Sequence, residues 1–175
     1  MSDIPILETD RLILRPHLLS DYADCLALWS APNTVRFIGG KVQSEQEVWF
    51  RLLRYAGMWA LLGFGFWVFE EKATGRYVGE GGLLDARRGI AALDGKPEIG
   101  WVLTPDAGGK GYATEAVRAV TRWADSVLKV PVTACIIEPE NVASIGVAAK
   151  CGYAEASRAQ RGDTNFIVYE RMRVS

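Results

Sequence analysis

The sequence predicts an α/β domain in which a mixed, mostly antiparallel sheet of about seven strands is flanked by about four helices. One observation is the order of strand-like and helix-like segments, β-α-α-β-β-β-α-β-α-β-β. Another is a glycine-rich turn that leads directly into an amphipathic helix. A chain of 175 residues has the usual length of one domain, so we expect residues 1–175 to form a single unit.

The first half of the chain supplies one strand, two helices and a three-strand meander. Alternating apolar residues predict a strand at Leu12–Arg15, and helical spacing predicts helices at Ser20–Ser30 and Ser44–Leu62. Short apolar or alternating runs bounded by Gly, Asp or Pro then indicate antiparallel strands. These runs are Phe64–Glu70, Arg76–Leu84 and Glu98–Leu103.

The second half is predicted from the helix that follows the glycine turn. One face of this helix is apolar at helical spacing, with Ala113, Ala116, Val117, Val120, Trp123, Ala124 and Val127. Val132–Ile137 is predicted to be a buried strand, and Asn141–Cys151 a short helix closed by Gly152. Tyr153–Arg161 and Asn165–Arg173 are predicted to form a terminal strand pair.

Residues 108–116, Gly-Gly-Lys-Gly-Tyr-Ala-Thr-Glu-Ala, predict a phosphate site. The first N–H groups of a helix have no intrahelical acceptor, and the helix dipole makes that end partly positive. Gly109 and Gly111 would let a phosphate approach the backbone closely, and Lys110 adds a cation. Taken alone, the turn is equally well explained as an ordinary helix start.

Two rival phosphate motifs do not fit this turn. A Walker A loop requires Ser or Thr after its Gly-Lys pair, where this chain has Gly111. The dinucleotide-binding fingerprint requires a third glycine, where this chain has Thr114. The turn therefore belongs to another class of anion-binding loop, if it binds an anion.

Five segments carry a wider resemblance through their order and spacing: Leu7–Arg15, Glu98–Leu103, Gly109–Ala116, Asn141–Ser144 and Lys150–Tyr153. Together they resemble the GNAT superfamily of acetyl-CoA-dependent N-acetyltransferases, and within it the ribosomal-protein N-terminal acetyltransferase-like (RimJ/RimL-type) branch. The resemblance implies the GNAT fold, in which splayed strands form an acetyl-CoA cleft.

The same resemblance implies acetyl-CoA (CoA) as the cofactor and indicates the residues that bind it. The strand before the loop would hold the pantetheine arm and the acetyl carbonyl, mainly through the main chain of Trp101, Val102 and Leu103. Asn141 and Ser144 would contact the cofactor from the next helix, although helix capping explains Asn141 equally well. The predicted pyrophosphate contacts are Gly108, Gly109, Lys110, Gly111, Tyr112, Ala113 and Thr114. Gly108 departs from the family pattern, which has Gln or Arg at this position.

Transfer of an acetyl group to an amine requires a base and a way to accommodate the leaving thiolate. The resemblance places an acidic residue on the strand before the loop, so Glu98 is the predicted general base. Its apolar neighbours are expected to raise its pKa. Glu80 is the competing candidate, and a solvated glutamate at a strand start is the plain alternative for Glu98. Many GNAT enzymes carry a tyrosine as general acid where this chain has Ala148, so Ser144 is predicted to relay a proton or to bond the thiolate.

Composition bounds the partners of the chain. A net charge of −1 without a basic segment argues against nucleic acid and against an anionic membrane surface. Three cysteines without metal-type spacing are expected to be reduced thiols, and no secretory pattern precedes Asp10. We therefore expect a cytoplasmic protein. His17, the single histidine, is expected to be a surface or loop residue, and no metal site is predicted.

Three functions are consistent with these observations. The favoured one is an N-acetyltransferase that moves an acetyl group to a primary amine by direct transfer in a ternary complex. The alternatives are a catalytically weak or inactive acyl-CoA-binding module and a nucleotide-binding transferase. The acceptor, a small-molecule amine or a protein N-terminus, is not fixed by the sequence. Arg87 and Arg88 in the loop Asp85–Pro97 are most simply explained as solvated. The oligomeric state is left open, a homodimer included.

Overall fold

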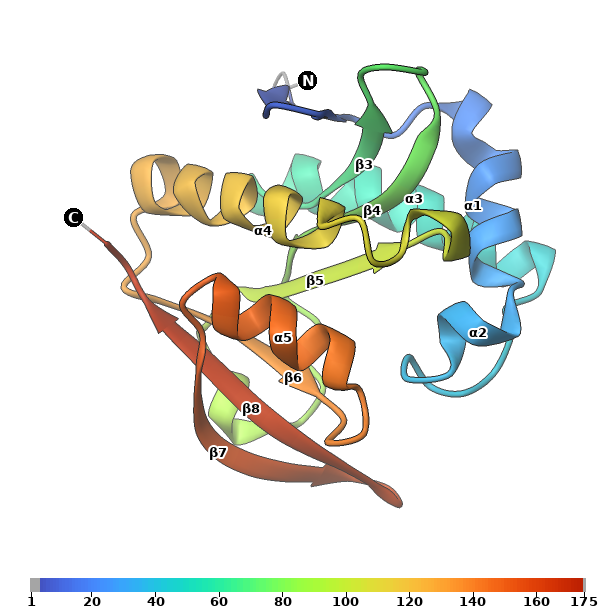
Figure 1. Cartoon of the computed structure of the whole chain (residues 1–175). Coiled ribbons are helices and arrows are strands. Elements are labelled where there is room, and N and C mark those ends of the chain that lie inside the picture. The colour runs from blue at the N-terminus through green and yellow to red at the C-terminus, as the bar shows by residue number, and fades with distance from the viewer. Residues whose placement is uncertain (1–3, 175) are drawn as a thin grey trace.

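The computed structural model describes residues 4–174, and its centre is one open sheet of eight strands in the order β1-β2-β3-β4-β5-β6-β8-β7 (Figure 1). Neighbouring strands are antiparallel except β5 and β6, which are parallel. The strands are β1 (Leu7–Glu8), β2 (Leu12–Arg15), β3 (Phe66–Glu71), β4 (Tyr77–Leu84), β5 (Glu98–Leu103), β6 (Val132–Ile137), β7 (Ala154–Arg161) and β8 (Thr164–Met172). The predicted GNAT fold with a mostly antiparallel sheet is confirmed.

Helices cover both faces of this sheet, with α4 and α5 on one face and α1 and α3 on the other (Figure 1). Their bounds are α1 (Tyr22–Trp29), α2 (Pro32–Val35), α3 (Glu45–Leu62), α4 (Tyr112–Trp123) and α5 (Val142–Lys150). A π-helical turn, Ala124–Leu128, continues α4, and short 3-10 turns span Leu19–Asp21, Ala91–Leu93 and Pro105–Ala107. No helix in the described part of the chain is long and apolar enough to cross a membrane.

The sequence analysis missed two elements, β1 and α2. They contain two and four residues, so neither is long enough to show a hydrophobic period. The longer α3 was predicted over Ser44–Leu62; it begins at Glu45 with Ser44 as its N-cap, and its ends follow from local chemistry. Ser44 and Glu47 form a capping box, and Gly63 ends the helix in the left-handed region with φ of 72°.

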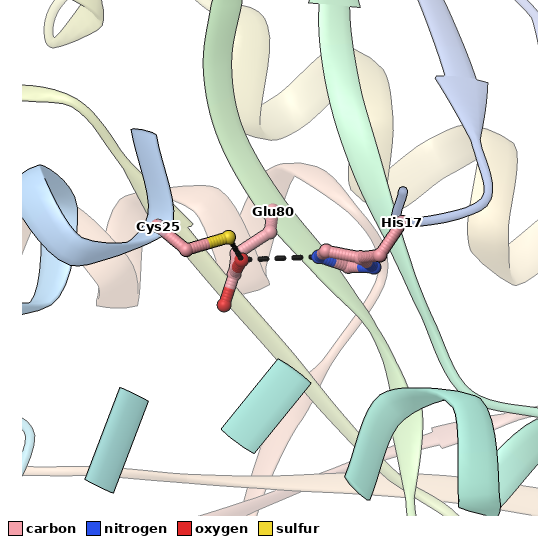
Figure 2. Close-up of side chains that lie close together, drawn as sticks. All are labelled: His17, Cys25 and Glu80. Atoms are coloured by element: carbon pink, nitrogen blue, oxygen red, sulfur yellow. Dashed lines mark hydrogen bonds and ion pairs between the residues drawn. The ribbon is translucent and has the colours of Figure 1, made fainter. Parts of the chain in front are cut away.

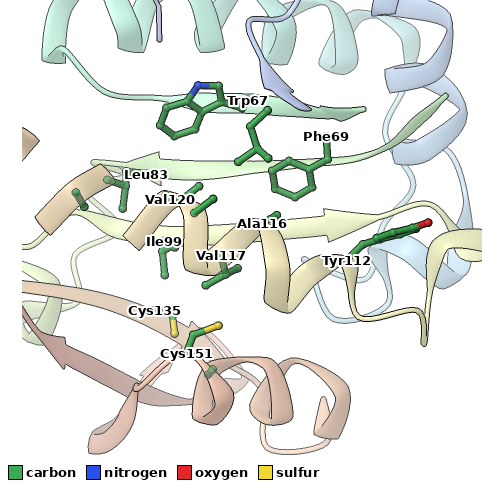
Figure 3. Packing of buried hydrophobic residues seen from close by; sticks show 14 of the residues in the cluster. Trp67, Phe69, Leu83, Ile99, Tyr112, Ala116, Val117, Val120, Cys135 and Cys151 are labelled. Atoms are coloured by element: carbon green, nitrogen blue, oxygen red, sulfur yellow. The ribbon is translucent and has the colours of Figure 1, made fainter. Parts of the chain in front are cut away.

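The core between α4 and the sheet is built from the apolar face that the sequence predicts for α4. Ala116, Val117 and Val120 point toward the sheet (Figure 3). On the sheet they meet apolar side chains that include Trp67, Phe69, Leu83 and Ile99. This packing fixes the start of α4 beside the end of β5.

The tryptophans divide between core and surface. Trp59, Trp67 and Trp123 form a group of edge-on rings with centroids 4.6–5.6 Å apart. Trp29 is also buried, whereas Trp49 on α3 is 40% exposed. Most of the tryptophans are therefore core residues.

Candidate active site

The parallel pair β5 and β6 separates soon after it forms. The two strands pair only at Glu98 and Ala134, whereas β5 pairs with β4 along its whole length. Beyond this point the edge of β5 that faces β6 has no strand partner. β5 leads through the glycine-rich turn into α4, and β6 leads into α5 (Figure 1).

The direction of the backbone groups on β5 decides which of them face the opening. Thr104 N–H donates to Val78 O of β4, and Pro97 O accepts from Ala134 N–H of β6. Because these directions alternate along a strand, Trp101 and Leu103 turn their backbone groups toward the opening, while Val102 turns its groups toward β4. Of the three predicted main-chain contacts, Trp101 and Leu103 are therefore placed to bind a ligand. Val102 instead pairs with Glu80 and packs its side chain against α1 and α3.

The glycine turn presents bare backbone at the start of α4. Gly109 and Gly111 have φ of 75° and 83°, in the left-handed region that favours glycine. Gly111 is the N-cap and provides no side-chain hydrogen bond, so the first N–H groups of α4 remain available to an anion. Lys110 is exposed beside them and forms no ion pair within residues 4–174. Gly108, with φ of −60°, has an ordinary conformation.

Arg11, the residue just before β2, supports this turn, and this contact was not predicted from the sequence. Its Nη1 donates to Lys110 O at 2.9 Å, and its guanidinium lies 4.6 Å from the centre of the Tyr112 ring. Glu115 of α4 accepts from Arg11 Nε at 2.7 Å and from Thr9 Oγ1 at 2.6 Å. These contacts join residues about a hundred positions apart, so no local pattern in the sequence could show them.

The side chains of the turn are used mainly for packing. Tyr112 is buried, and its hydroxyl donates to Glu71. Ala113 is buried, and Thr114 O accepts a contact from Cys151 Sγ at 3.6 Å. A Cβ on Gly111 would lie 3.4 Å from Arg11 Nη2. The part of the turn that can meet a ligand is therefore its backbone.

Helix α5 faces the opening from the side of β6. Asn141 Oδ1 accepts from Ser144 N–H at 3.1 Å, so Asn141 is the N-cap that its position predicts. The Ser144 hydroxyl forms no hydrogen bond within the described chain and stays free for a ligand. Ala148 is completely buried in the core between the sheet and α4. Position 148 of α5 therefore has no side chain that could act as a general acid.

Glu98 lies at the point where β5 and β6 part, on the face of the sheet that α1 and α3 cover. It is almost fully buried, and Arg88 donates a hydrogen bond to each of its oxygens. Arg88 Nε lies 2.9 Å from Oε2, and Nη2 lies 3.0 Å from Oε1. The expectation that Arg88 is solvated is therefore wrong. Arg87 remains exposed and, among residues 4–174, forms an ion pair only with Asp85. The sequence did not reveal this ion pair, because Arg88 lies in a loop and its partner Glu98 lies on the next strand, ten residues further along the chain.

Glu80 lies on the same face of the neighbouring strand and is completely buried (Figure 2). Five side chains surround its carboxylate, and we call this group the Glu80 cluster. Oε1 accepts from Trp29 Nε1 at 2.8 Å and from the Tyr55 hydroxyl; Oε2 accepts from the Tyr77 hydroxyl at 2.7 Å, His17 Nε2 at 3.1 Å and Cys25 Sγ at 3.6 Å. The cluster joins the segment after β2, which holds His17, to α1, α3 and β4.

The donors of the Glu80 cluster keep this carboxylate ionised. Burial alone would raise the pKa of Glu80, but hydrogen bonds from His17, Tyr55 and Tyr77 outweigh it and lower the pKa to about 2. Burial and then the charge of Glu80 raise the pKa of Tyr55, of Tyr77 and of the Cys25 thiol. These groups therefore remain protonated and able to donate.

His17 is not the surface residue that the sequence suggested, since its side chain is only 5% exposed. Its ring packs on Tyr55 with centroids 4.5 Å apart. An ionised carboxylate can only accept, so His17 donates from Nε2 to Glu80. His17 Nδ1 is buried without a partner. The spacing of these residues in the chain gave no sign that they meet.

His17, Cys25 and Glu80 also have the composition of a metal site, since their ligand atoms all lie within 4.8 Å of one another. The hydrogen bonds argue for a different interpretation. Each oxygen of Glu80 already accepts from two or three donors, and the Cys25 thiol stays protonated. A cation would have to displace these donors. The cluster is therefore built to hold the negative charge of Glu80, not to bind a metal.

The remaining cysteines, Cys135 and Cys151, are buried free thiols. Burial raises the pKa of both, so neither has the character of an activated nucleophile. The expectation of reduced cysteines agrees with this arrangement. Transfer through an acetylated cysteine gains no support from it.

Splayed parallel strands beside a glycine-rich helix start define the class of acetyltransferases that bind acetyl-CoA. Residues 11–154 match the model of the acetyltransferase (GNAT) domain, and the chain belongs to this family. Membership implies acetyl transfer that depends on acetyl-CoA.

Individual relatives agree with this assignment. The chain is 29% identical over 169 residues to the uncharacterized protein YkkB of Bacillus subtilis, covering 94% of each chain. It is 26% identical over 150 residues to the uncharacterized N-acetyltransferase YoaA of the same organism, covering 85% of this chain and 82% of YoaA. It also resembles the crystal structure of an acetyltransferase from Agrobacterium tumefaciens, with a TM-score of 0.84, 28% identity and coverage of 97% and 95%.

Proposed function

We propose that this protein is an N-acetyltransferase that moves the acetyl group of acetyl-CoA directly to a primary amine in a ternary complex. The observation that carries the proposal is the opening of β5 from β6 after a single pair of residues. The backbone N–H groups of Trp101 and Leu103 have no strand partner along this opening, which runs from the Glu98 position toward the start of α4. Acetyl-CoA bound along the opening from the α4 side would bring its thioester close to an amine bound on the side of the sheet that holds Glu98.

The cofactor would lie along three elements. Its pyrophosphate would bind the backbone of Gly108–Thr114, with Lys110 adding charge. The pantetheine arm and the acetyl carbonyl would bind Trp101 and Leu103, whose backbone groups face the opening. Asn141 and Ser144 would contact the cofactor from α5, with Ser144 bonding the departing sulfur. The N–H groups near the carbonyl would stabilise the oxyanion that forms during transfer.

Glu98 is the proposed general base. An acetyl transfer step consumes the amine lone pair, and the proton released from the nitrogen must pass to a base near the acceptor. Glu98 lies where β5 and β6 separate, on the face of the sheet that α1 and α3 cover, where the acceptor amine would bind in this proposal. Glu80 is the weaker candidate, because its pKa of about 2 leaves it little affinity for a proton and its oxygens are fully hydrogen-bonded.

Incubation with labelled acetyl-CoA and a mixed library of amines tests the proposal. Label should move to at least one amine, and CoA should raise the thermal unfolding temperature while ATP and NAD do not. Stabilisation by ATP or NAD alone would contradict the proposal. The amines in the library should include small molecules and peptides with free N-termini, because either could be the acceptor.

An acyl-CoA-binding module without transfer is the second candidate. Two observations favour it: Arg88 occupies both oxygens of Glu98, and α5 has buried Ala148 where many GNAT enzymes have a tyrosine. Binding of acetyl-CoA with no transfer to any amine would select this candidate.

We further infer that the protein belongs to the ribosomal-protein N-terminal acetyltransferase-like branch and works in the cytoplasm. The order of the segments Leu7–Arg15, Glu98–Leu103 and Gly109–Ala116 supports the branch. The three free cysteines support a reducing compartment. Fractionation of the cells that make the protein would test its location.

A further inference from the structure

Helix α3 is apolar on two opposite sides. Its inner side is buried against the rest of the protein and includes Val48, Leu52, Tyr55 and Trp59. Its other side, which we call the outer face of α3, exposes four large apolar side chains: Trp49 by 40%, Phe50 by 58%, Leu53 by 47% and Leu61 by 85%. A helix at the surface of a protein usually carries polar residues on its outer side. The outer face of α3 therefore requires an explanation.

Charged residues are scarce on this outer face. The first turn of α3 carries Glu45 and Glu47, but within residues 48–62, all of which the structure describes, the only exposed charged side chain is Arg54. A helix that lies on a membrane surface has a polar side rich in Lys and Arg beside its apolar one. The outer face of α3 is therefore better suited to contact with another apolar protein surface.

Gly57 lies in the middle of the outer face. Trp49, Leu53, Gly57 and Leu61 follow one another at intervals of four residues, so they form one row along the helix. Apart from the backbone of α3 itself, no atom of the described chain lies within 4 Å of the place where a Cβ on Gly57 would be. A glycine inside a helix costs about 0.5–1 kcal/mol relative to alanine. A partner that approaches α3 closely at Gly57 would explain why no side chain is present there.

We propose that the outer face of α3 is the interface between two copies of this chain, which pair through antiparallel α3 helices around a two-fold axis at Leu53. Such an axis brings Leu53 beside Leu53 of the second copy and places Trp49 of each copy over Gly57 of the other. The row is complementary to itself, because a large side chain and a gap lie four residues to either side of Leu53. This inference does not depend on the proposed acetyl transfer.

Charge favours the antiparallel order. Parallel α3 helices would bring the acidic first turns of the two copies together, and like charges repel. In the antiparallel order, Glu45 and Glu47 of each copy lie toward residues 54–62 of the other, which contain Arg54 and no acidic residue. Arg54 follows Leu53 directly and therefore lies about 100° around the helix from it, at the edge of the interface, where its charge can stay in water.

The outer face is large enough for a stable pair. A whole aromatic side chain covers about 150–250 Å², so the exposed parts of the four large side chains amount to roughly 400 Å² in each copy. Ala56, Ala60 and Leu62 are exposed on the same helix and add to this area. Two copies would therefore bury about 1,000 Å² in total, which is the area that a specific interface requires.

Sedimentation equilibrium of the whole chain tests the pairing, because the parent protein should have twice the mass of one chain. Leu53→Glu would bury two negative charges at the axis and should raise the dissociation constant at least roughly 100-fold. Gly57→Leu fills the gap over which Trp49 of the other copy would lie and should also weaken the pair. Met172→Glu is the matched control, because Met172 is 65% exposed on β8, in the other half of the sheet, and its dissociation constant should equal that of the parent.

Cysteine variants test the position of the axis. The three natural cysteines are buried, so an introduced thiol is the one that reacts. With oxidised glutathione, Leu53→Cys should form a disulfide between the two copies. Leu61 lies eight residues further along, about 12 Å down the helix, so the two copies of this residue would be about 24 Å apart in an antiparallel pair. Leu61→Cys should therefore form no disulfide between the copies.

Three results would overturn the proposal. The first is a parent protein that stays monomeric at the highest concentration it tolerates, and the second is a dimer that Leu53→Glu leaves intact. The third is a disulfide in Leu61→Cys that forms as readily as the one in Leu53→Cys. If the monomeric parent instead binds vesicles of phosphatidylcholine and phosphatidylserine and Leu53→Glu does not, the outer face belongs to a membrane contact. Circular dichroism checks that Leu53→Glu folds, and the cysteine variants decide the question if it does not.

Discussion

Glu80→Gln should strongly destabilise the protein, although it alters one atom of a completely buried side chain. The amide nitrogen that replaces one oxygen is a donor, and it would face groups that already donate to Glu80. Trp29 cannot accept a hydrogen bond, and Tyr55 and Tyr77 would have to turn. The pKa of Glu80 falls from an ordinary 4.5 to about 2, which corresponds to about 3 kcal/mol of favourable interaction with the ionised form.

The pH dependence of this effect has a definite sign. A carboxyl group with a lowered pKa in the folded state stabilises the protein fully above its unfolded pKa, near 4.5, and loses that contribution as the pH falls toward 2. The difference in unfolding free energy between the parent and Glu80→Gln should therefore be largest at pH 6–7. It should shrink by about 3 kcal/mol between pH 5 and pH 2.

Urea denaturation at a series of pH values measures this difference directly. Glu155→Gln on exposed β7 is a matched control and should change the unfolding free energy by no more than about 0.5 kcal/mol. A parent and Glu80→Gln of equal stability at pH 7 would refute the reasoning, as would a difference that does not vary between pH 5 and pH 2. Either result would mean that the five donors do not stabilise the ionised form of Glu80.

Four further substitutions test the cofactor side and the base. Gly111→Ala places an L residue at φ of 83°, so it should cost about 1–2 kcal/mol and distort the turn, and calorimetry should show weaker CoA binding. Glu98→Gln should lower the transfer rate by about 10²–10⁴ with little effect on acetyl-CoA affinity, and an unchanged rate and pH profile would show that another group is the base. Asn141→Ala removes the cap that bonds Ser144 N–H and should lower the unfolding free energy by about 1 kcal/mol, whereas Ser144→Ala should not.

Most of the fold could be predicted from local patterns in the sequence, because the residues that make a strand or a helix form lie within that strand or helix. The limits of β5 and β6 were predicted to the residue, since both are apolar runs bounded by proline or a turn. Helix α4 was predicted from its apolar face and its glycine start. The short elements β1 and α2 could not be predicted, because they are held by their neighbours rather than by a period of their own.

The candidate site was predictable only where the chemistry is local. The glycine turn and the capping residue Asn141 are read within a few positions of the chain. By contrast, Arg11 meets Glu115 across more than a hundred residues, and His17 meets Glu80 across more than sixty. Such contacts depend on how strands and helices are stacked. They explain why His17 was expected at the surface.

The two carboxylates on the face of the sheet that α1 and α3 cover differ in their surroundings. Glu80 is enclosed by five donors from several elements, so its charge is fixed and it offers no free lone pair to a substrate. Glu98 has one side-chain partner, Arg88, which comes from a loop and is partly exposed. Glu80 therefore helps to hold α1 and α3 against the sheet through Trp29, Cys25 and Tyr55. Glu98, whose side-chain partner Arg88 lies on a partly exposed loop, is the better of the two candidates for the proposed base.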